Sequence, residues 1–85
     1  MDKSKQIKRL HIDNPATYKI CVQGYLEDVW SDRLADMTIT IYEKEGTAPE
    51  SILTGKVRDQ AELVGVLNGL YGLRMPILAV ELIQE

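Results

Sequence analysis

The sequence contains no phenylalanine, a single tryptophan, a single histidine, His11, and a single cysteine, Cys21. One cysteine and one histidine can form neither a disulfide nor a four-ligand zinc site within one chain. No segment approaches the roughly 18 apolar residues of a membrane-spanning helix, and the N-terminal residues do not lead into the apolar core of a secretory signal. We therefore expect a cytoplasmic protein with no cofactor, no metal and no membrane contact.

The residues that are present are those of an ordinary globular chain. Of the 85 residues, 45% are hydrophobic and 27% are charged, and the net charge is −3. This acidic excess favours solubility and argues against nucleic acid as a partner. A chain of this length buries only roughly 60–65% of the surface that its unfolded form exposes. A face that the chain leaves uncovered is therefore expected to bind a partner, and self-association is the simplest case.

Two parts of the chain differ in pattern. Residues 1–16 carry four cations among polar residues and are predicted to be a flexible basic tail, with contact to an acidic partner as the alternative interpretation. Residues 17–85 are predicted to be a single α+β domain. Alternation of apolar and polar residues predicts four strands, at residues 17–26, 37–43, 51–57 and 77–83.

Two helices are expected between these strands. The first is short, at residues 27–36, and begins with Asp28 as its cap. The second begins at Asp59, which has Glu62 three residues later in a capping-box spacing. Gly72 suits the position just past its end. The residues expected to pack on the sheet are Leu63, Val64, Leu67, Leu70 and Tyr71.

The element order is therefore strand, helix, strand, strand, helix, strand. This order predicts the ferredoxin-like βαββαβ plan, a four-stranded antiparallel sheet with two helices on one face. The alternative is a three-stranded meander followed by a helix and a strand, because residues 27–36 are near the minimum length for a crossover. The ferredoxin-like plan places Trp30 and Asp59 at opposite ends of the sheet, whereas the meander places them at the same end.

The second half of the chain contains an extended motif. Residues 53–68 read L-x-G-x-x-x-D-Q-A-x-L-x-G-V-L-N, and Gly24-x-Leu26 and Trp30-Ser31-Asp32 precede them. In these residues the chain resembles a family of small bacterial proteins of unknown function. The resemblance implies a fold, and it implies no activity or site residues.

No set of residues in the sequence converges on a catalytic site. Val22-Gln23-Gly24 resembles the start of the phosphate-binding loop of acylphosphatases, but Glu27 and Asp28 follow where an anion site needs amides and an arginine. RNA-recognition motifs share the fold plan, yet this chain is acidic and lacks their glycine and aromatic run. We therefore expect no catalysis and no nucleic-acid binding.

The sequence features that could carry a function are therefore surfaces for binding. We predict a non-catalytic interaction or ligand-binding module that forms a homodimer through the open face of its sheet. The alternative is a small enzyme or ligand sensor whose site is completed across a dimer. The predicted interface residues are Gln23, Tyr25, Thr40, Tyr42, Thr54, Ile77 and Ala79. A second candidate surface, on the back of the main helix, consists of small residues that would admit another helix closely: Gly65, Asn68 and Gly69.

Overall fold

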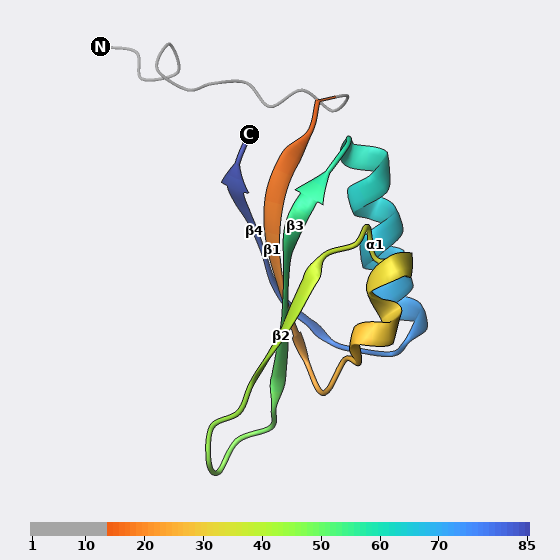
Figure 1. Ribbon diagram of the computed structural model, residues 1–85. Helices are drawn as coiled ribbons and strands as arrows, with labels where there is room; N and C mark the ends of the chain where they lie inside the picture. The colour runs from red at the N-terminus through yellow and green to blue at the C-terminus, as the bar shows by residue number, and fades with distance from the viewer. Residues whose placement is uncertain (1–13) are drawn as a thin grey trace, which may run out of the picture.

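The computed structural model describes residues 14–85, so the predicted tail lies almost entirely outside the described residues (Figure 1). One antiparallel sheet has an α-helix and a short 3-10 helix together on one of its faces. In chain order the elements are β1 (Ala16–Gln23), η2 (Asp28–Arg33), β2 (Thr38–Tyr42), β3 (Glu50–Val57), α1 (Gln60–Gly72) and β4 (Ile77–Gln84).

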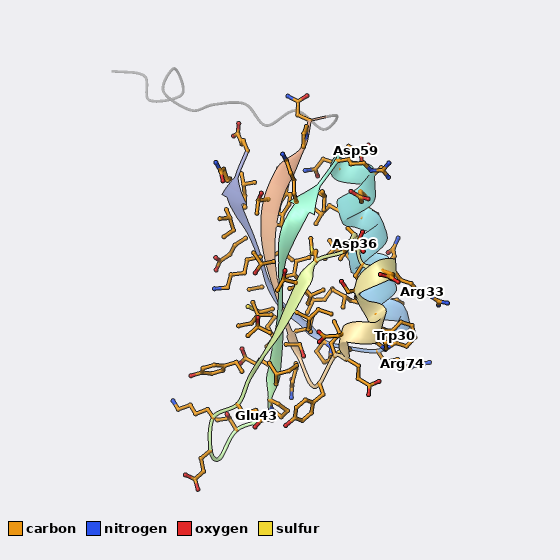
Figure 2. The ribbon with its side chains drawn as sticks, in the orientation of Figure 1. Trp30, Arg33, Asp36, Glu43, Asp59 and Arg74 are labelled. Carbon is orange, nitrogen blue, oxygen red and sulfur yellow. The ribbon has the colours of Figure 1, made fainter. Side chains whose placement is uncertain are left out.

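The strand order across the sheet is β2-β3-β1-β4, and every neighbouring pair is antiparallel. The meander is wrong, because β1 pairs with β3 and β4 rather than with β2. Asp59 lies at one end of the sheet and Trp30 lies well away from that end, whereas the meander would place the two together (Figure 2). The two outer strands, β2 and β4, each leave one edge without a partner among residues 14–85.

The core lies between the sheet and the two helices. Alternate residues of β1 and β3 point toward the helices, and Ile20, Val22 and Leu53 among them are completely buried. Leu26, Leu34 and Met37 close the core at the side where η2 lies, and Trp30 packs on it while partly exposed. The alternation in these two strands therefore predicted the buried face correctly.

The first helix differs from its prediction. It is a six-residue 3-10 helix whose N-cap is Glu27, and no side chain caps it, so the expected cap at Asp28 is wrong. The amides of Leu34 and Asp36 both donate to the Ser31 carbonyl oxygen, and Ala35 and Asp36 adopt positive φ angles of 59° and 54°. These contacts reverse the chain toward β2 before an α-helix can develop. The sheet thus has one α-helical crossover, whereas the ferredoxin-like plan has two.

The start of α1 is as predicted and its end is not. The amide of Glu62 donates to Oδ1 of Asp59 over 2.8 Å, which confirms the cap. Gly72, however, is the last helical residue rather than the residue past the end. The left-handed position belongs to Arg74, with φ 62°, and the amides of Arg74 and Met75 donate to the last turn of the helix. This arrangement of bonds is a Schellman motif built without glycine.

The buried face of α1 is also rotated from the predicted stripe. Leu63, Val66 and Leu70 are buried. Val64 is 51% exposed and Tyr71 is 81% exposed, so their assignment to the core is wrong. Leu34 packs against one side of α1, where its Cδ2 lies 3.1 Å from the position a Cβ of Gly69 would take. That contact turns Val66 inward and leaves Val64 and Tyr71 outside the core.

Candidate functional site

The open face of the sheet, opposite α1, contains most of the predicted interface residues. The strand register aligns four of its uncharged residues in one row across the sheet, in the order Thr40, Ile52, Cys21 and Ala79. The row beside it contains Thr54 together with Lys19 and Glu81. Glu50, on β3, pairs with Tyr42 on β2 and with Gln23 on β1. The centre of this face is therefore neutral and its neighbouring rows are charged.

Two of the predicted residues do not belong to this arrangement. Tyr25 follows β1 and lines a hollow together with the turn between β2 and β3, which includes Lys44 and Gly46. Ile77 pairs with Val22 at an irregularity in the register between β1 and β4. The alternation that placed both residues on the open face does not continue through the ends of β1 and β4.

The three small residues on the back of α1 have different surroundings. A Cβ at Gly65 would meet nothing within 4 Å, and Asn68 is exposed. Gly69 instead faces Leu34, in the link between η2 and β2. Gly69 thus serves the packing of that link against α1, whereas Gly65 and Asn68 face open space.

This difference gives a prediction for two matched substitutions. Gly65→Ala should raise the free energy of unfolding by about 0.5–1 kcal/mol, because alanine is the better helix former and its methyl group has open space. Gly69→Ala should gain clearly less or lose stability, because its methyl group would crowd Leu34 Cδ2. Urea denaturation followed by the fluorescence of Trp30 measures both. Equal gains at the two positions would show that Leu34 moves away without cost.

The last strand, β4, has exposed large apolar residues along its whole length. In β4 the large aliphatic residues are all between 40% and 51% exposed, namely Ile77, Leu78, Val80, Leu82 and Ile83. Val80 pairs with Ile20 and Leu82 with Tyr18, so both side chains lie on the core face of the sheet although they are not covered. The helices cover β1 and β3, and β4 lies at the far edge of the sheet (Figure 1).

A flank of α1 adds to this surface. Gln60 donates to the Tyr18 hydroxyl over 2.8 Å, which shows which side of the helix is turned toward β1. Val64 and Tyr71 lie four and eleven residues after Gln60 and share that side. We use the term β4 flank for the exposed apolar residues on the helix side of the sheet: Val64, Tyr71, Leu78, Val80 and Leu82.

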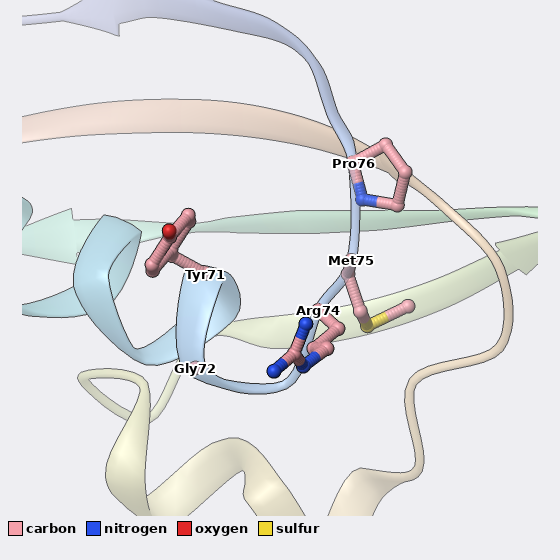
Figure 3. Close-up of a pocket in the computed structure, with 5 residues that line it drawn as sticks. All are labelled: Tyr71, Gly72, Arg74, Met75 and Pro76. Carbon is pink, nitrogen blue, oxygen red and sulfur yellow. The ribbon is translucent and has the colours of Figure 1, made fainter.

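A hollow lies where α1 turns into β4, at one end of the β4 flank. Its volume is about 370 Å³ and its lining is Tyr71, Gly72, Arg74, Met75 and Pro76. Figure 3 shows Tyr71 on the last turn of the helix and Pro76 on the link that enters β4. Arg74 is the one charged residue of this lining.

Two kinds of functional feature are absent from the described residues. Among residues 14–85, no group of three or more His, Cys, Asp or Glu residues is placed to hold a metal ion. No helix in this range is long and apolar enough to cross a membrane. What the range does contain is a strand edge that pairs with no other described strand and has exposed apolar residues beside it.

Comparison with known proteins gives one match. The model of a family described as a domain of unknown function (DUF8691) matches residues 17–81. The match extends from the second residue of β1 into β4 and so includes every element of the fold. No curated protein and no solved structure matches the chain.

Proposed function

We propose that this chain, which belongs to the DUF8691 family, is a non-catalytic protein-interaction module that binds its partner along β4. The observation that carries the proposal is the half-exposure of all five large aliphatic residues of an eight-residue edge strand. Burial of apolar surface contributes roughly 25 cal/mol per Å², so a strand in this condition gains stability when another chain covers it. The partner would add a strand at the free edge of β4 and cover the β4 flank.

The composition of β4 is that of a strand that pairs with a partner and not that of an edge strand that stays unpaired. Edge strands that remain single are usually protected by lysine, proline or short length. Within Ile77–Gln84 there is no lysine and no proline, and Glu81 is the one charged residue. The other edge strand, β2, has five residues, two of them threonine, and η2 lies beside it. Of the two edge strands, β4 is therefore the better candidate for pairing with another chain.

The open face is a second contact surface for the same class of function. Its support is the neutral row of Thr40, Ile52, Cys21 and Ala79, which crosses all four strands. A homodimer through this face would bury that row, with Tyr42 and Thr54 around it. The charged residues Lys19 and Glu81 in the adjacent row make this surface the weaker candidate, because burying them costs free energy.

A ligand-binding role has one supporting observation, the hollow beside Arg74. It opens next to the β4 flank, so a chain that covers β4 would also narrow the hollow. A ligand sensor of this kind would have its site completed by the partner chain, with the Arg74 guanidinium as the group that selects an anionic ligand.

We also propose that the architecture is a variant of the ferredoxin-like plan. The support is the strand order β2-β3-β1-β4 with antiparallel neighbours, and the placement of both helices on one face. The variant feature is the replacement of the first crossover helix by the 3-10 turn Asp28–Arg33.

Site-specific photocrosslinking in cells tests the proposed function. A photoreactive amino acid at Leu82, on the β4 flank, should give a covalent protein adduct, and the same group at Thr54, on the open face, should not. Adducts from Thr54 alone would show that the partner binds the open face of the sheet and not β4. If neither position gives an adduct, the chain is not an interaction module.

A further inference from the structure

We infer that the partner that covers β4 is a second copy of this chain, paired antiparallel to it, β4 against β4, about a two-fold axis at Val80. This inference rests on the proposed interaction along β4 and adds the identity and register of the partner. Its support is the self-complementary order of side chains along Ile77–Gln84, together with the free edge of this strand.

Geometry limits the registers to a few. Residues directly opposite one another in an antiparallel pair point to the same face of the sheet. For two identical strands joined in one sheet, the two-fold axis must therefore pass through a residue and not between two residues. The axis then lies at Ala79, at Val80 or at Glu81, since positions farther out leave little of the strand paired.

Side-chain chemistry selects among these three. An axis at Glu81 would set two identical carboxylates opposite each other, which is unfavourable. An axis at Ala79 would set Pro76, which has no amide hydrogen, opposite Leu82 of the partner subunit, well inside the paired region, whereas an axis at Val80 moves it to the last position, opposite Gln84 of the partner subunit. An axis at Val80 sets Val80 against Val80 of the partner subunit and Leu78 against Leu82 of the partner subunit.

The register at Val80 also places the charges well. Glu81 then faces Ala79 of the partner subunit, so no like charges are opposed, and Glu81 keeps Lys19 as its cross-strand neighbour on β1. Val80 and Leu82, which pair with Ile20 and Tyr18, lie on the core face of the sheet, where the matching side chains of the second copy would meet them. Both copies of α1 would lie on the same side of one continuous eight-stranded sheet.

The expected affinity is moderate. The contact is a single strand pair with its adjoining side chains, and we expect a dissociation constant on the order of 10 µM for the wild-type dimer. Sedimentation equilibrium of the full chain across that concentration measures it.

A charge-swap experiment at Val80 tests the partner and the register together. Val80→Lys and Val80→Asp should each weaken self-association at least about thirtyfold, because each sets like charges against each other at the axis. An equal mixture of the two variants should restore a dimer, because lysine then faces aspartate. Val29→Lys, on η2 and 74% exposed, adds a charge outside both β4 and the open face; it is the matched control and should leave the constant unchanged.

A second pair of variants avoids the core face, in case the charges at Val80 prevent folding. Ala79 faces the open side of the sheet opposite Cys21. In the inferred register Ala79→Lys gains two symmetric contacts with Glu81 of the partner subunit and should tighten the dimer roughly three- to tenfold. Ala79→Glu should weaken it by a similar factor, and high salt should reduce both effects.

The outcomes separate this inference from the proposed function. A wild-type chain that is monomeric at concentrations on the order of 300 µM overturns the second copy as partner. Photocrosslinking at Leu82 to a different protein would then still support the interaction module. A dimer that the mixed Val80 variants do not restore, and that Ala79→Lys does not tighten, overturns the register at Val80.

Discussion

Replacing Gly55 with alanine is expected to lower the free energy of unfolding by about 2–3 kcal/mol. Gly55 lies in β3 opposite Tyr18, and Met37 crosses directly over it. A Cβ at this position would lie 2.8 Å from Cγ of Met37 and 3.1 Å from its Cα. Met37 is buried with 1% of its surface exposed, so it has nowhere to move without opening the core beside η2.

Urea denaturation of the Gly55 variant gives the measurement, with Trp30 fluorescence as the probe. The matched control is Gly65→Ala, which adds the same methyl group in open space and should stabilise the protein. In a Met37→Ala background, Gly55→Ala should cost less stability than in the wild type, because the 2.8 Å contact with Met37 Cγ is gone and only the contacts with Cα and Cβ of residue 37 remain. A loss below about 0.5 kcal/mol for Gly55→Ala alone would show that the link between η2 and β2 adjusts freely.

Local rules predicted the strands and the start of the main helix. Alternation in residues 17–23 and 51–57 identified the buried faces of β1 and β3, because each strand has one face packed on the core and one face directed away from it. The cap at Asp59 depends on a contact three residues away and needs no tertiary information. Elements whose environment is decided within one turn or one strand were therefore accessible from sequence.

The rotation of α1 and the form of η2 were not accessible in this way. Val64 and Val66 are equally apolar, and the packing of Leu34 against Gly69 decides which of them turns inward. The early end of η2 likewise depends on the positive φ angles of Ala35 and Asp36, residues that do not ordinarily signal that conformation. The rotation of α1 thus involves a contact between elements, whereas the end of η2 depends on local backbone bonds and φ angles that the apolar pattern does not encode.

The candidate site was missed for a related reason. The pattern of Ile77–Gln84 is that of a strand rich in aliphatic residues, and it predicts Leu78, Val80 and Leu82 on one face without showing whether that face is covered. The structure shows that the helices cover β1 and β3 but not β4, so Val80 remains exposed on the core face. A strand whose pattern predicts burial and whose position leaves it uncovered is the signal that points to a partner chain.

Ser51→Ala is the second substitution with a large expected effect, a loss of about 2–4 kcal/mol in the free energy of unfolding. Ser51 is a completely buried polar residue on the core face of β3. Its hydroxyl donates to the Gly24 carbonyl oxygen over 2.6 Å and accepts from the Leu26 amide over 2.9 Å. Alanine would remove one oxygen and leave two backbone groups without partners, and such groups are costly to bury.

The same bonds explain how the chain leaves β1. Gly24 has φ 110°, a conformation that other residues rarely adopt, and its amide donates to the Pro49 carbonyl oxygen. Ser51 thus holds both sides of the turn that sends Leu26 into the core and sets the position of η2. We expect Ser51→Ala to accelerate hydrogen exchange at the Leu26 amide, while Thr54→Ala, on the exposed face of the same strand, changes stability by less than about 0.5 kcal/mol. If the Leu26 amide exchanges as slowly in the Ser51→Ala variant as in the wild type, the buried hydroxyl does not hold the turn. The positive φ angle of Gly24 and its bond to the Pro49 carbonyl oxygen then hold it instead.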